Sequence, residues 1–215
     1  MKNIYIFSGL GVDKRVFKNL NSEGFDTTFI LWITPKKNET IEAYAKRLCA
    51  QIKTERPILI GLSFGGMMAI EVAKLIETEK VILLSSAKTK YEIPWYFRLA
   101  GKTKIQKILP AKILSSSNAM LNWFFGITTD EEKTLLKTIL NESNPQINRW
   151  SIDKIVSWKN KKIPNNLIHI HGTSDRILPF RYVKKDFTVE KGGHFMILNK
   201  AEEINVILKK ILIAD

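Results

Sequence analysis

The segment Gly61-Leu62-Ser63-Phe64-Gly65 places a serine between two glycines, and another glycine follows at position 66. An apolar run, residues 57–62, leads into this segment, and the mostly apolar residues 64–76 have the length of a helix. A serine on a sharp strand-to-helix turn has its hydroxyl exposed past the end of a sheet, where it can attack a substrate. Small residues on both sides of the serine let the two backbone arms pass close together. We therefore predict that Ser63 is the nucleophile of a serine hydrolase.

A serine hydroxyl needs a neighbouring base, and the chain contains three histidines. His194 follows two glycines in a predicted loop after a strand, where its side chain can lie over the end of the sheet, and we predict that it is the base. His169 and His171 alternate within the predicted strand 166–171 and therefore share one face of it. We interpret this pair as structural, or as a hydrogen-bonding pair near the end of the sheet. A metal site would need further ligands, which the nearby sequence lacks.

An imidazole base in turn needs an acid that fixes its tautomer and stabilises its charged form. Asp175 comes just after the strand that ends at His171, and it precedes His194 in the chain. Loops that follow parallel strands lie at the same edge of a sheet, so Ser63, Asp175 and His194 are expected to meet there. The alternative is a turn-forming aspartate without a catalytic duty.

The negative oxygen formed during acyl transfer must be held by backbone N–H groups. One donor is expected to be the N–H of Phe64, directly after the nucleophile. The other is expected in the loop after the first strand, Gly9-Leu10-Gly11, where we assign it to Leu10. The two glycines also suit a tight turn, and both interpretations can hold together.

Short apolar runs alternate with helical patterns along much of the chain. This alternation predicts an α/β fold with a mostly parallel sheet and helices on both faces. The predicted strands are residues 3–7, 26–32, 57–62, 80–84, 166–171 and 186–189, and the predicted helices of this part are residues 13–20, 39–53, 64–76 and 201–213.

The alternation breaks between residues 88 and 161, where the sequence shows only helical signals. The four candidate helices there are residues 94–107, residues 110–125, one that opens at Thr129 and one that opens at Asn144-Pro145. An asparagine followed by proline is typical of a helix start. We predict a helical insertion of roughly 70 residues, about half a typical domain. Its aromatic residues suggest an apolar acyl pocket, although they suit an ordinary hydrophobic core equally well.

The chain has 215 residues, 45% of them hydrophobic, which fits one domain with a sizeable core. Its net charge of +13 is interpreted first as a lysine-rich, soluble surface, and no nucleic-acid-binding module accompanies it. The single cysteine, Cys49, excludes an internal disulfide and suits a reducing compartment. The apolar start is too short for a signal peptide, and no run reaches the ~18 residues of a membrane span. We expect a cytoplasmic protein without stable membrane insertion and without nucleic acid as a partner, and the sequence leaves its oligomeric state open.

These segments together resemble the α/β-hydrolase superfamily over nearly the whole chain, most closely its small bacterial carboxylesterase-like members. The resemblance rests on residues 8–11, 61–66, 171–175 and 192–195, and on the order serine, aspartate, histidine. It implies a core formed by residues 1–87 and 162–215, with residues 88–161 as a helical cap inserted within a single domain. Because the match begins at what is usually the third strand of the family, it implies a reduced sheet of about six strands. Many members have His-Gly where this chain has Ser8-Gly9.

We accordingly predict a serine hydrolase that cleaves a carboxylic ester or thioester through an acyl-enzyme, without cofactor or metal. The partner is expected to be a small acyl substrate. Basic residues of the insertion could steer an anionic one; they are Lys88, Lys90, Arg98, Lys102, Lys104, Lys107 and Lys112. The alternatives are a ligand-binding protein of the same fold without catalysis, and a lipase-like enzyme at anionic membrane surfaces.

Overall fold

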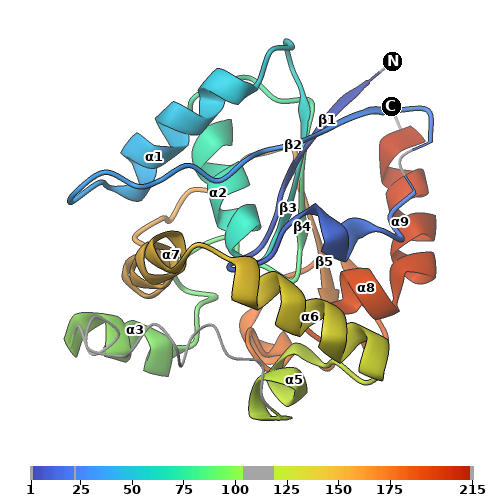
Figure 1. The fold of residues 1–215 in the computed structure, drawn as a ribbon. Coiled ribbons are helices and arrows are strands. Elements are labelled where there is room, and N and C mark those ends of the chain that lie inside the picture. Colours follow the sequence, from blue (N-terminus) through green and yellow to red (C-terminus); the bar gives the residue numbers. More distant parts are fainter. Residues whose placement is uncertain (1, 22, 104–118, 214–215) are drawn as a thin grey trace.

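The computed structural model describes residues 2–21, 23–103 and 119–213 (Figure 1). Six strands form one sheet in the order β2-β1-β3-β4-β5-β6, and every neighbouring pair is parallel. The strands are β1 (Asn3–Phe7), β2 (Asp26–Phe29), β3 (Ile58–Leu62), β4 (Lys80–Leu84), β5 (Leu167–Gly172) and β6 (Phe187–Val189). The predicted fold class, a mostly parallel sheet of about six strands flanked by helices, is confirmed.

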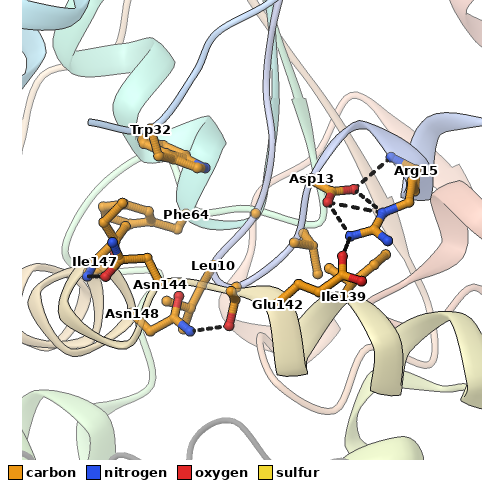
Figure 2. Close-up of a pocket in the computed structure, with 15 residues that line it drawn as sticks. Leu10, Asp13, Arg15, Trp32, Phe64, Ile139, Glu142, Asn144, Ile147 and Asn148 are labelled. Atoms are coloured by element: carbon orange, nitrogen blue, oxygen red, sulfur yellow. Dashed lines mark hydrogen bonds and ion pairs between the residues drawn. The ribbon is translucent and has the colours of Figure 1, made fainter. Parts of the chain in front are cut away.

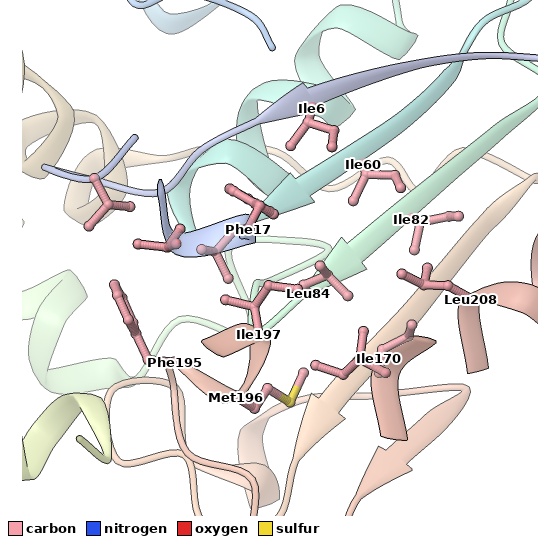
Figure 3. Packing of buried hydrophobic residues seen from close by; sticks show 14 of the residues in the cluster. Ile6, Phe17, Ile60, Ile82, Leu84, Ile170, Phe195, Met196, Ile197 and Leu208 are labelled. Carbon is pink, nitrogen blue, oxygen red and sulfur yellow. The ribbon is translucent and has the colours of Figure 1, made fainter. Parts of the chain in front are cut away.

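The sheet is covered on both faces because successive side chains of a buried parallel strand point to opposite sides. In β1, Ile4 and Ile6 belong to one hydrophobic cluster, whereas Tyr5 and Phe7 belong to the other. Figure 3 shows the first cluster, in which Ile6, Ile60, Ile82 and Ile170 of four neighbouring strands face helix residues such as Leu208.

Two helices cover each face of the sheet (Figure 1). Helices α1 (Ile41–Leu48) and α2 (Phe64–Ala73) pack on the Tyr5 side, and α8 (Met196–Asn199) and α9 (Ala201–Ile213) pack on the Ile6 side. Nine of the ten residues of α2 are buried, which explains its apolar character all round.

Four described helices lie between β4 and β5, within the predicted insertion. They are α3 (Trp95–Thr103), α5 (Ala119–Phe125), α6 (Asp130–Glu142) and α7 (Pro145–Ser157). The predicted starts of the last two hold: Thr129 forms a capping box with Glu132, and the Asn144 side chain caps α7 ahead of Pro145. The end of the first predicted helix and the beginning of the second fall outside the described residues.

Several local predictions differ from the structure. The predicted helix after Asp13 is only a 3-10 turn (Lys14–Phe17), capped by the Asp13 carboxylate. The predicted helices 39–53 and 64–76 are α-helical only over Ile41–Leu48 and Phe64–Ala73. Strand β2 ends at Phe29 instead of residue 32, because the Leu31 N–H donates to the Gln51 side chain at 2.9 Å rather than to a strand. The short helix α8 was not predicted at all.

Within the described ranges, no helix is long and apolar enough to cross a membrane.

Candidate active site

The chain changes direction at Ser63, which joins the end of β3 to the start of α2. Ser63 has φ 52° and ψ −118°, a backbone conformation that non-glycine residues rarely adopt and that costs of order 1–3 kcal/mol. The surrounding backbone holds it there: its N–H donates to Leu84 O at 2.9 Å, and its carbonyl accepts from the Ser86 hydroxyl at 2.6 Å. The turn therefore presents a partly exposed side chain at the carboxyl edge of the sheet.

The glycines around Ser63 are required by close backbone approaches. A Cβ on Gly61 would lie 2.4 Å from Gly66 Cα, and one on Gly65 would lie 2.2 Å from Phe7 O. Both contacts are shorter than real Cβ atoms make, and both are with backbone. The serine and glycine pattern of the sequence is thus the steric condition for this turn.

His194 lies in the loop that follows β6, and its ring reaches the turn at Ser63. Its Nε2 lies 2.8 Å from Ser63 Oγ, and its Nδ1 lies 2.8 Å from Asp175 Oδ2. An ionised carboxylate only accepts hydrogen bonds, so Nδ1 carries the proton and Nε2 is free to accept the serine proton. The ring is 1% exposed and packs against Phe125 of α5, with the ring centroids 5.8 Å apart.

Asp175 is the third member of this chain of hydrogen bonds, and its side chain is 0% exposed. Its Oδ1 accepts from the N–H groups of Ile177 and Leu178 at 2.9 and 2.8 Å, and its Oδ2 faces His194. Burial opposes ionisation of this group. The histidine charge and the hydrogen bonds more than offset burial, so the pKa of Asp175 is lowered from its ordinary value. Asp175 is therefore held as a carboxylate beside the imidazole.

The loops that carry Asp175 and His194 are fastened to each other. A Cβ on Gly172, at the end of β5, would lie 2.2 Å from Gly192 O. The Ser174 N–H donates to the same carbonyl at 2.9 Å. This contact fixes the acid and the base relative to each other through the backbone.

His169 and His171 do not reach Ser63 but support the Asp175 turn and the neighbouring loop. His171 Nε2 donates to Leu178 O at 2.8 Å and lies 3.5 Å from Asp175 Oδ2. His169 Nδ1 lies 3.1 Å from Lys184 O, and the two histidine rings meet edge to face. Burial lowers the pKa of both histidines. No group of three or more His, Cys, Asp or Glu side chains in the described ranges is arranged to hold a metal ion.

The loop after β1 lies directly beside the turn at Ser63. A Cβ on Gly9 would be 3.6 Å from Ser63 Cβ, so the segment Gly9-Leu10-Gly11 begins next to the serine. Ser8 has a structural role here, because its hydroxyl accepts from Trp32 Nε1 at 2.8 Å. Leu10 and Phe64, the donors predicted from the sequence, line the same cavity.

A cavity of about 260 Å³ opens from these two residues (Figure 2). One wall is formed by the loop after β1, Trp32 and Phe64, and the other by the end of α6 and the start of α7. The sequence did not identify the polar side chains of the second wall, Asn148 and Ser151. Their spacing of three within a helical pattern was the only available signal.

By sequence, the chain matches no protein-family model and no curated protein. Its structure is similar to many solved structures over their full domains. The match to a hydrolase from Oleispira antarctica (11% identity) covers 100% of this chain and 92% of that protein, with a TM-score of 0.71. An enol-lactonase from Burkholderia xenovorans LB400 (18% identity) covers 99% and 92%, with a TM-score of 0.66. A bromoperoxidase from Bacillus anthracis (16% identity) covers 98% and 91%, with a TM-score of 0.67. The chain has the α/β-hydrolase fold, as the sequence resemblance implied.

Proposed function

We propose that this chain is a serine hydrolase that cleaves a carboxylic ester or thioester through an acyl-enzyme. The observation that carries the proposal is the continuous path from Ser63 Oγ through the His194 ring to Asp175 Oδ2, with 2.8 Å at both hydrogen bonds. Hydrolases and esterases occur among the similar folds, although that likeness shows the fold alone.

In the first half of the proposed reaction, His194 Nε2 takes the Ser63 proton while Oγ bonds to the acyl carbon. The carbonyl oxygen becomes negative and accepts hydrogen bonds from the N–H groups of Leu10 and Phe64. Asp175 stabilises the imidazolium without taking its proton. Nε2 then donates the proton to the leaving oxygen or sulfur, the bond to the leaving group breaks, and the acyl-enzyme remains.

The second half repeats these steps with water. His194 Nε2 removes a proton from water as its oxygen bonds to the acyl carbon, and the resulting imidazolium returns that proton to Ser63 Oγ as the acid departs. No group outside this set of residues is called upon.

The test is labelling with a fluorophosphonate, which bonds covalently to an activated serine, followed by a panel of acyl esters and thioesters. We expect the wild type to be labelled and Ser63→Ala to be unlabelled and at least about 10⁴-fold slower. Ser174→Ala is the matched control, because Ser174 is exposed at the same edge and only its backbone is hydrogen-bonded in the described structure. Esterase activity that survives in Ser63→Ala would sink the proposal. A ligand-binding protein without catalysis would show neither labelling nor turnover.

A lipase-like action at anionic membranes remains a second candidate because one surface carries exposed aromatics. Trp95 and Tyr96 of α3 are 58% and 38% exposed, and Trp123 of α5 is 55% exposed. Aromatic side chains beside basic ones suit a membrane interface. Binding to phosphatidylglycerol vesicles that falls in Trp95→Ala would support this candidate, and equal binding by both proteins would remove it.

A further inference from the structure

The two buried residues of α7 are both polar. Asn148 and Ser151 are the fully buried residues of this helix, with 5% and 1% of their surfaces exposed. They are three residues apart and therefore project from the same side of the helix. A buried polar group costs free energy unless it is hydrogen-bonded, so a polar face turned inward calls for a partner.

Both side chains retain hydrogen-bonding capacity. Asn148 Nδ2 donates to Ser143 Oγ at 2.7 Å, and Ser143 Oγ donates to Leu140 O at 2.6 Å, which fixes the orientation of the amide (Figure 2). Among the residues that the structure describes, no hydrogen bond involves Asn148 Oδ1 or the Ser151 hydroxyl, and neither atom is one of the fully enclosed polar atoms left without a partner, so each keeps some accessible surface. One acceptor and one hydroxyl are thus left on this face.

The two groups line the same cavity as the proposed oxyanion donors, Leu10 and Phe64. Gly11 brings the loop after β1 close to the Asn148 amide, since a Cβ on Gly11 would lie 3.5 Å from Nδ2. A substrate group that extends past the oxyanion donors therefore meets Asn148 and Ser151.

The cavity begins beside the nucleophile. Neither Ser63 nor His194 lines it, but both proposed oxyanion donors do, as does Gly9, whose Cβ would lie 3.6 Å from Ser63 Cβ. In the proposed reaction the leaving atom takes its proton from His194, so it must lie within hydrogen-bond reach of that ring. We therefore assign the cavity, which extends from the oxyanion donors, to the group that stays on Ser63 in the acyl-enzyme.

The charges at the cavity mouth favour a neutral acyl group. The Arg15 guanidinium lies 2.6 Å from both Asp13 Oδ2 and Glu142 Oε2 (Figure 2). Two carboxylates thus neutralise the single positive charge of Arg15, so this guanidinium does not attract an anionic substrate group. Of the basic residues expected to steer an anionic substrate, Lys88 is buried and paired with Asp186 at 3.3 Å.

We propose that the acyl group of the substrate is short and carries a neutral hydroxyl, bound by Asn148 Oδ1 and Ser151 Oγ. The inference rests on the proposed function and names its substrate class: esters or thioesters of short hydroxy acids. The hydroxyl would donate to Asn148 Oδ1 and accept from Ser151. The cavity, at about 260 Å³, is smaller than the 300–1,000 Å³ or so of sites for drug-sized ligands, and it suits a group of a few carbon atoms.

The test compares the p-nitrophenyl esters of butanoic and 3-hydroxybutanoic acid, which differ by one hydroxyl. We expect the wild type to prefer the hydroxy ester by about tenfold in kcat/KM, the range for one or two neutral hydrogen bonds. In Asn148→Leu and the milder Ser151→Ala, we expect most of this preference to disappear because kcat/KM falls for the hydroxy ester and not for the butanoate ester. Ser157→Ala is the matched control, because it removes an exposed serine hydroxyl from the same helix, outside the cavity.

Two outcomes would overturn the inference. The first is a wild type that hydrolyses both esters equally or prefers the butanoate. The second is a variant that slows both esters by the same factor. Fluorophosphonate labelling separates these from failure of the proposed function. Labelling without discrimination overturns only the hydroxyacyl inference, whereas absence of both labelling and turnover overturns the hydrolase proposal and this inference with it.

Discussion

The carboxyl edge of the sheet and the helices between β4 and β5 both bury polar side chains, but they hold them differently. At the sheet edge, the Ser63, His194 and Asp175 side chains are joined to one another by hydrogen bonds within a largely buried setting. In the helices, Trp95 and Trp123 are more than half exposed, and the two buried residues of α7 are polar side chains that line the cavity.

This difference separates two tasks. The sheet edge is fixed by backbone contacts that leave little freedom, so it specifies one chemistry. The helical segment instead contributes a few polar side chains to the cavity, where a substrate would lie. We infer that reaction type is encoded at the strand ends, and that substrate choice is encoded in α6 and α7.

The sharpest test of the first task is Asp175→Asn, for which we expect kcat/KM to fall by about 10⁴-fold. The amide N–H₂ would compete for the position that accepts from His194 Nδ1, or force the ring into the wrong tautomer. Ester hydrolysis at saturating and limiting substrate measures the loss, and a decrease below tenfold would contradict it.

The same variant has a second readout in acid. Because the folded pKa of Asp175 is lowered, its ionisation stabilises the protein fully above its unfolded value of 3.8, and this contribution is lost as the pH falls below that value. The variant should lack this part of the acid-induced loss. Urea unfolding of both proteins between pH 3 and 6 would show it.

A second test addresses the contact between the two loops at the sheet edge. We expect Gly172→Ala to lower the free energy of unfolding by about 3 kcal/mol or more, because its Cβ would lie 2.2 Å from the backbone oxygen of Gly192, which cannot move aside as a side chain could. Gly24→Ala is the control: it has no atom within 4 Å, and its positive φ alone costs about 1–2 kcal/mol. Equal urea midpoints for the two variants would mean that the contact between the loops is not rigid.

A third, smaller effect comes from the histidines beneath the Asp175 turn. Burial lowers the pKa of His169 and His171, so the unfolded chain binds protons that the folded chain does not. Stability is therefore full above the unfolded value of 6.5 and falls as the pH drops below it, with a slope of up to about 1.4 kcal/mol per pH unit for each histidine. Urea unfolding between pH 7 and 5 measures the slope, and His169→Gln should reduce it. A flat profile would contradict buried neutral histidines.

Much of the sheet edge could be predicted from the sequence because its signals are local. The turn at Ser63 needs small neighbours at fixed offsets, and the central strands β3 and β4 are nearly continuous apolar runs. The order of Ser63, Asp175 and His194 along the chain, combined with a parallel sheet, was enough to bring them to one edge. Their distances agree with that expectation, and their catalytic roles stay a proposal.

The cavity could not be predicted, for a physical reason. Helical periodicity shows that Asn148 and Ser151 share a face, but not that the loop after β1 lies opposite them. The early end of β2 likewise depends on the Gln51 side chain, a contact across 20 residues that no local pattern encodes. Both depend on tertiary neighbours, which override local propensity.

The smallest expected effect concerns the exposed aromatics of the helical segment and tests the other half of the comparison. Trp95 is 58% exposed, so Trp95→Ala should change the free energy of unfolding by less than about 0.5 kcal/mol. Trp158, just after α7, is 4% exposed and donates from Nε1 to the buried Glu71 at 2.8 Å. Trp158→Phe removes that donor and should cost about 1–3 kcal/mol. If Trp95→Ala lowered the free energy of unfolding as much as Trp158→Phe does, the Trp95 ring would be part of a core, and its outward placement would be wrong.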